Sequence, residues 1–106
     1  MTPQDFDKLL AARLDKIKAV LSSKATEYAH GNDRLHNFQV AARIDDTTPE
    51  QALWGMLLKH LVSVSDLVKG RLQPTRSMVN EKIGDTVNYL ILLEAIFAER
   101  GESFDR

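Results

Sequence analysis

Two rows of polar side chains interrupt the most apolar helical segments of the chain. Glu81, Asp85 and Asn88 follow one another at i, i+4 and i+7 in the segment EKIGDTVNYLILLEAIF, and this spacing places them on one side of a helix. The same line continues into Leu92 and further apolar positions. Carboxylates in the first turns of a helix can also remain in water and favour the helix dipole. Because this row leads directly into apolar positions, we expect the three side chains to point inward.

Lys59, Ser63 and Asp66 repeat this spacing on the preceding helical segment. One interpretation is a solvated helix surface; the other places this row opposite the first, across two packed helices, with Asp66 and Glu81 as neighbours. Lysine and serine would then serve a bound anion and the carboxylates a cation, because buried acids need a counter-charge or a proton. The chain has no cysteine, and oxygen ligands favour Mg²⁺ or Mn²⁺.

A third polar cluster occupies the segment KATEYAHGNDRLHNF, residues 24–38. Glu27 lies seven residues after Val20, on the continuation of an apolar stripe, so an inward position is expected for it as well. A polar segment beside a helix end is usually a surface loop. Its density of amide, imidazole and guanidinium groups nevertheless suits a phosphate or base pocket, for which the candidates are Arg34, His36 and Asn37.

The elements that must position these residues are all predicted to be helices, since no segment alternates as a strand does. Thr2 before Pro3 is typical of a helix start, and Gly70 and Gly101 are typical of helix ends. The pattern predicts helices over residues 3–30, 33–44, 49–69 and 76–100. The expected fold is a single all-α domain, residues 1–106, built as an antiparallel bundle of three long helices and one short one.

Composition limits the class of function. The chain has 106 residues, 43% of them hydrophobic, and a formal net charge of −1, so no basic excess points to nucleic acid as the main partner. The N-terminal segment lacks the pattern of a signal peptide, and no apolar run reaches the ~18 residues of a membrane span. We therefore expect a soluble cytoplasmic protein without a membrane partner.

The segments EKIGDTVNYLILLEAI, LLKHLVSVSDLVKG and EYAHGNDRLHNF carry a family resemblance. Together they resemble the small phage-type members of the MazG-like, all-α nucleoside triphosphate pyrophosphohydrolase superfamily, over roughly residues 24–97. The resemblance implies a helical bundle that assembles as a homo-oligomer, in which acidic residues of two helices hold Mg²⁺ and the metal presents a nucleotide's phosphates to water. For a phage-encoded chain, the location would be the host cytoplasm.

The acidic motifs of that family are matched in part. Glu81 and Asp85 match the ends of the pattern E-E-x-x-D, with Lys82 at the inner glutamate, and the expected E-x-x-E falls where Asp66 is the acidic residue. The resemblance implies metal ligation by Asp66, Glu81, Asp85 and Glu27. It further implies catalytic roles for Glu81, Asp85 and Lys59, and contacts with the nucleotide from Arg34, His36, Asn37, Ser63, Asn88 and Tyr89.

Two functions therefore remain open at this point. The first is Mg²⁺-dependent hydrolysis or binding of a nucleoside triphosphate or related nucleotide. The second is a non-enzymatic helical module that binds a nucleotide or a host or phage protein. A structural role in a phage particle is a third alternative, which a bundle without a pocket would favour.

A homo-oligomer is also expected from helix length. The first predicted helix would extend near 40 Å, which is long for so small a domain and leaves apolar flank uncovered. Trp54, Met56 and Phe97 are the predicted interface residues.

Overall fold

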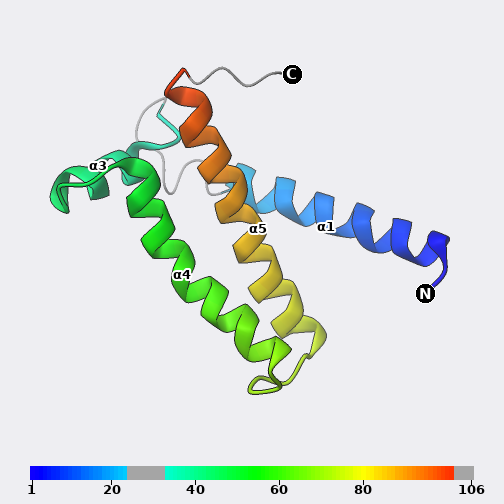
Figure 1. Ribbon diagram of the computed structural model, residues 1–106. Coiled ribbons are helices and arrows are strands. Elements are labelled where there is room, and N and C mark those ends of the chain that lie inside the picture. Colours follow the sequence, from blue (N-terminus) through cyan, green and yellow to red (C-terminus); the bar gives the residue numbers. More distant parts are fainter. Residues whose placement is uncertain (24–32, 102–106) are drawn as a thin grey trace.

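The chain folds into four helices in the parts that the structure, a computed structural model, describes: residues 1–23 and 33–101. They are α1 (Pro3–Ser23), α3 (His36–Ile44), α4 (Pro49–Val68) and α5 (Arg76–Glu99) (Figure 1). Three are long and one is short, which confirms the all-α prediction. None of these helices is long and apolar enough to cross a membrane.

Threonine caps fix the starts of α4 and α5. The Thr48 hydroxyl accepts a hydrogen bond from the Gln51 backbone N–H at 3.2 Å, and the Gln51 side chain accepts from the Thr48 N–H at 3.2 Å. The Thr75 hydroxyl accepts from the Met78 N–H at 3.2 Å. Each bond satisfies a backbone donor that the first helical turn leaves without a partner.

Gly70 ends α4 in a Schellman motif. Its φ of 78° lies in the left-handed region, which glycine adopts without a steric penalty. The N–H of Arg71 donates to the carbonyl of Asp66 at 2.8 Å, and that of Gly70 donates to Leu67 at 3.2 Å. The turn that follows returns the chain antiparallel to α4, so that α4 and α5 form a helical hairpin (Figure 1).

The two N-terminal predictions need adjustment. Of the predicted helix 3–30, residues 3–23 are helical, and residues 24–30 lie outside the described residues. The second helix begins at His36 and not at residue 33. The reason is local, because the Asp33 carboxylate accepts a hydrogen bond from the Leu35 N–H at 3.0 Å and holds residues 33–35 in a turn.

The hydrophobic core lies among α3, α4 and α5. The Arg100 guanidinium bonds to Glu50, and the Gln39 amide donates to Glu99 at 2.8 Å, which closes the same end of this three-helix unit. Met56 is partly buried against this core, and its place in an interface between copies stays a prediction. The buried core residues are Leu35, Phe38, Leu53, Leu57 and Ile96.

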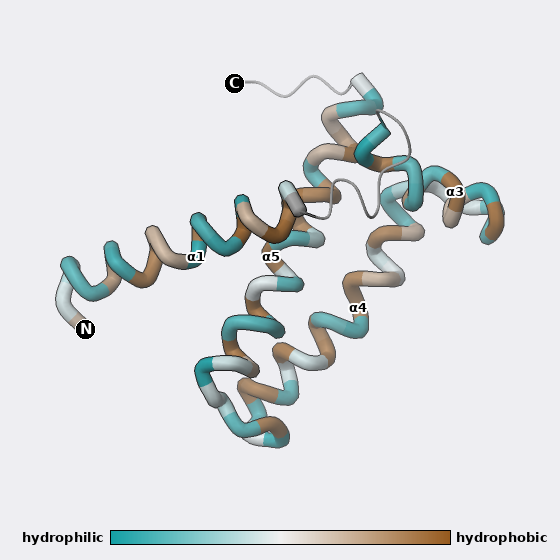
Figure 2. The backbone as a smooth tube through the Cα atoms, turned by 180° about the vertical axis from the view of Figure 1, so that it is seen from behind, coloured by the Kyte–Doolittle hydropathy of each residue, from teal (hydrophilic) through white to brown (hydrophobic). Residues whose placement is uncertain are grey.

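Helix α1 crosses α5 and projects away from the other helices (Figure 1). It packs on α5 through its C-terminal half, where Ile17 is buried. Residues 1–12 are all exposed. Hydrophobic positions nevertheless recur along α1 toward its N-terminal end (Figure 2).

Candidate functional site: a groove between α1 and α5

The polar row of α5 faces α1. Glu81, Asp85 and Asn88 all line an open groove of about 420 Å³ between the two helices. From α1 the groove receives two cationic side chains, Arg13 and Lys16, opposite the two carboxylates. The remaining lining residues are Ile17, Ala19, Val20, Ser77, Asn80 and Gly84. This groove therefore combines both charge signs over an apolar floor.

A smaller and more enclosed pocket of about 190 Å³ adjoins the groove. The two hollows share the lining residues Val20, Asp85 and Asn88, so they lie side by side. The pocket is mainly apolar and aromatic, with an amide and a guanidinium at its edge. Its other lining residues are Leu21, Arg34, Asn37, Phe38, Met56, Tyr89 and Leu92. It thus contains four predicted ligand-binding residues: Arg34, Asn37, Asn88 and Tyr89.

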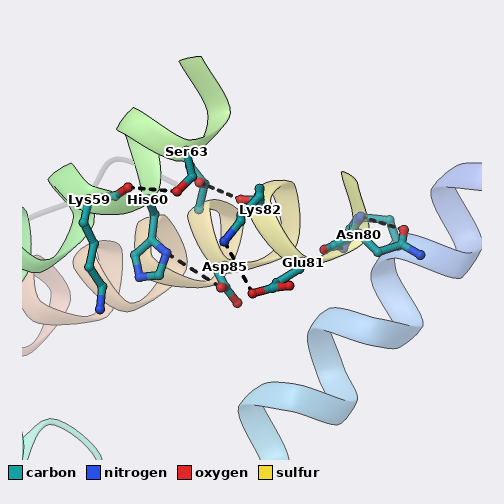
Figure 3. A network of polar contacts seen from close by, with 9 residues as sticks. Lys59, His60, Ser63, Asn80, Glu81, Lys82 and Asp85 are labelled. Carbon is teal, nitrogen blue, oxygen red and sulfur yellow. Dashed lines mark hydrogen bonds and ion pairs between the residues drawn. The ribbon is translucent and has the colours of Figure 1, made fainter. Parts of the chain in front are cut away.

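Arg13 holds α1 against α5 at the edge of the groove. Its guanidinium donates to the Asn80 backbone carbonyl and to the Asn80 side-chain oxygen, each at 3.3 Å. The side chain passes directly over Gly84, where a Cβ atom would lie only 2.7 Å from the Arg13 Nη1 atom. Glycine at this position is what lets the arginine cross α5 so closely. Figure 3 shows Asn80 turned toward α1.

His60 contacts Asp85 from the neighbouring helix. Its Nδ1 atom lies 3.7 Å from the Asp85 Oδ2 atom (Figure 3). Its ring lies 4.9 Å from the ring of Tyr89, tilted by 32°. The histidine is mostly buried, whereas Asp85 reaches the groove. His60 therefore contacts two residues of the site, Asp85 and Tyr89, from α4.

Two buried polar atoms of the pocket have no hydrogen-bond partner among the described residues. They are the Asn88 Oδ1 atom and the Arg34 Nη1 atom. Asn88 is only 8% exposed, while the other terminal nitrogen of Arg34 donates to the Leu21 carbonyl at 2.9 Å. Leaving a buried acceptor unpaired costs about 1–3 kcal/mol, so a ligand that donates to Asn88 recovers this energy.

The second polar row lines neither hollow. Lys59 is exposed, and the Ser63 hydroxyl donates to the Lys59 carbonyl at 3.3 Å within the same helix (Figure 3). Asp66 pairs with Arg71 at 3.6 Å, while Glu81 pairs with Lys82 at 3.5 Å. The polar row of α5 thus faces α1 across the groove. In the row of α4, Ser63 bonds within its own helix and Asp66 pairs with Arg71.

The remaining predicted site residues are His36 and Glu27. His36 is the first residue of α3 and lines neither hollow. Glu27 lies outside the described residues. Within the described ranges, no three acidic or histidine side chains are grouped closely enough to hold a metal ion. Metal ligation by Asp66, Glu81, Asp85 and Glu27 stays a prediction.

Three residues of this site were not among the predicted ones: Arg13, Lys16 and His60. The sequence does contain a signal for Arg13, the same one that marked Glu81: a charged residue in line with apolar positions of a helix. Arg13 lies three residues after Leu10 and four before Ile17, so it is a charged side chain in an apolar row. His60 gives no such signal, because its contact with Asp85 depends on how α4 packs on α5.

Comparisons with known protein families, with curated proteins and with solved structures find no match for this chain. The family resemblance therefore rests on the residue pattern alone.

Proposed function

We propose that the protein binds a nucleotide or a related phosphorylated small molecule, together with Mg²⁺, in the groove between α1 and α5. The observation that carries this proposal is the composition of the two adjoining hollows. The groove is lined by two carboxylates and two cationic side chains, and the pocket by aromatic, amide and guanidinium groups. The groove, at about 420 Å³, falls in the range of small-molecule sites, ~300–1,000 Å³, and the adjoining pocket adds about 190 Å³.

Glu81 and Asp85 are the residues that would hold the metal. They lie one helical turn apart on the same face and both reach the groove. Mg²⁺ is commonly bound by one or two carboxylates together with substrate phosphates, so a complete protein cage is not required. The ion would neutralise phosphate charge beside these two carboxylates.

The cationic and aromatic groups fit the remaining parts of a nucleotide. Arg13 and Lys16 of α1 lie on the opposite wall of the groove and supply positive charge for phosphate oxygens. In the pocket, the Tyr89 ring offers a surface for a planar base, and the unpaired Asn88 and Arg34 atoms offer an acceptor and a donor.

Hydrolysis of the bound nucleotide is the activity that the family resemblance implies. Binding without hydrolysis is the second candidate, and one contact favours it. Lys82 occupies the position of the inner glutamate of the family motif, and its ammonium lies 3.5 Å from Glu81. A lysine there supplies a positive charge where the family uses a carboxylate.

Thermal unfolding with each of the four common ribonucleoside triphosphates, with and without Mg²⁺, tests the proposal. A ligand at 100 times its Kd stabilises by about 2.7 kcal/mol, which corresponds to a rise in Tm of roughly 10 °C for a domain of this size. We expect that rise only when both components are present. Pyrophosphate release in the same mixtures separates hydrolysis from binding.

Matched variants locate the site. Asp85→Asn should weaken Mg²⁺-dependent binding at least about tenfold, which corresponds to ~1.4 kcal/mol. Glu94→Gln removes a carboxylate from an exposed position of the same helix and should leave binding unchanged. Asp66→Asn distinguishes the groove from a site shared with α4, since only the shared site needs Asp66. If none of the four triphosphates raises the Tm, either with Mg²⁺ or without it, the proposal is contradicted.

A further inference from the structure

The projecting half of α1 carries an apolar face that nothing in the described part of the chain covers. We call residues 3–14 the α1 arm. Its large apolar side chains are each between 44% and 53% exposed, and they share the face that buries Ile17 further along the helix. They are Phe6, Leu9, Leu10 and Leu14. The apolar face of α1 thus packs on α5 at its C-terminal end and is exposed to solvent at its N-terminal end. Such an exposed apolar face is typical of a surface that binds a partner.

A complementary surface lies on α4. Trp54, Leu58 and Val62 follow one another at i, i+4 and i+8 and are between 45% and 60% exposed. We call these three residues the α4 stripe. They are distinct from Leu53 and Leu57, which fill the core from the other side of the same helix. The α4 stripe is thus a second apolar row of matching length and helical spacing.

The two surfaces cannot meet within one chain. The α1 arm projects from α5 in the direction opposite to α4, as the front and back views both show (Figure 1, Figure 2). A second copy of the chain can offer its α4 stripe to the arm and receive an arm in return.

The exposed apolar side chains support a second copy as the occupant. Within the described residues, the arm and the α4 stripe together leave seven large apolar side chains between 44% and 60% exposed. In a two-fold contact each copy supplies both surfaces, so a single partner covers all seven.

Charge also favours this pairing over one arm against another. Asp5 and Asp7 are exposed and adjoin Phe6 on the arm. Of the arm's two cationic residues, Lys8 lies on the opposite face of the helix, and Arg13 is hydrogen-bonded to Asn80. On the α4 stripe, the exposed Lys59 adjoins Leu58. Arm against stripe brings opposite charges to the rim, whereas two arms in contact would add acidic residues from both chains. The net charge of −1 puts little general repulsion between copies.

We propose that the protein forms a two-fold dimer in which the α1 arm of each copy packs on the α4 stripe of the other. In such an isologous dimer the same contact forms twice, so the arm and the stripe of both copies are covered. This proposal is independent of the ligand proposed above.

Sedimentation at micromolar concentration gives the first test, with the chain's single tryptophan, Trp54, as a reporter. We expect an assembled species and a blue shift of tryptophan emission as concentration rises, because the arm of a second copy would cover the indole. A monomer at these concentrations would overturn the proposal.

Pairing of two variants gives the decisive test. Leu10→Glu in the arm and Leu58→Lys in the stripe should each weaken self-association at least about tenfold. Mixing the two variants should restore it, since one contact then pairs Glu with Lys and the other is unchanged. Contact between two arms, or between two stripes, predicts that one variant still assembles alone and that mixing rescues nothing. Either result would overturn the proposal.

Two controls accompany the mixture. Lys8→Glu places the same side chain on the opposite face of the arm and should leave assembly intact, since Lys8 is exposed and lies about 160° around the helix from Phe6 and Leu10. A second pair, Leu14→Glu with Val62→Lys, repeats the test at independent positions. Far-ultraviolet circular dichroism confirms that each variant retains its helices, and failed rescue by both pairs of folded variants would reject the pairing of arm with stripe.

Discussion

At the scale of single residues, the contact of Arg13 with Gly84 is the tightest fit between α1 and α5. The atom nearest to an added Cβ is the end of a flexible side chain, so an alanine at position 84 would move Arg13 and not the backbone. The cost is then the loss of two hydrogen bonds to Asn80, about 0.5–1.5 kcal/mol each.

Gly84→Ala and Gly55→Ala form a matched pair that measures this contact. Gly55 is helical and exposed, with no described atom within 4 Å of an added Cβ, so its substitution should stabilise the protein by roughly 0.5–1 kcal/mol. Gly84→Ala should gain less or destabilise. In an Arg13→Ala background the two substitutions should have equal effects in urea unfolding. Equal effects in the parent protein would show that Arg13 does not depend on Gly84.

At Asn88 the proposed binding site would reduce the stability of the fold. Its Oδ1 atom is buried without a hydrogen-bond partner in the described chain, and replacing an unpaired amide by a side chain of similar shape removes that cost. We expect Asn88→Leu to raise the free energy of unfolding by about 1–2 kcal/mol and to abolish nucleotide binding. A destabilised Asn88→Leu protein would mean that the amide is satisfied in solution.

At the scale of elements, helix ends were predictable because their causes are local. Thr48 with Gln51, Thr75 and Gly70 act within a few residues of their own position, so the starts of α4 and α5 and the end of α4 follow from sequence. The partner of a helix face is not local. Spacing shows that Glu81, Asp85 and Asn88 share a side, but the packing of α1 on α5 decides that this side meets Arg13 and Lys16.

Helix α1 should be the least protected of the long helices against hydrogen exchange. The buried core cluster draws its residues from positions 35–96, and α1 contributes none of them. We expect the amides of α1 to exchange at least about tenfold faster than those of α5 near Ile96, because α1 can separate while the core stays closed. Hydrogen-exchange mass spectrometry measures these rates, at a protein concentration too low for self-association. Equal protection would show that all four described helices open as one unit.

At the scale of the whole molecule, α1 projects from the unit that α3, α4 and α5 form (Figure 1). Residues 1–12 are exposed, and the core cluster takes no residue from α1. The proposed dimer would cover this projecting half, as a reciprocal contact between two copies does.

The position of the groove between α1 and α5 would couple the affinity of the proposed ligand to the docking of α1. One wall belongs to α1, which contributes no residue to the core cluster, so a molecule with α1 undocked would lack that wall. The apparent Kd would then be the intrinsic Kd divided by the docked fraction. A change at Gly84, where Arg13 crosses α5, should therefore alter affinity through the docking of α1. A ligand that bridges α1 and α5 would in turn shift the population toward the docked state.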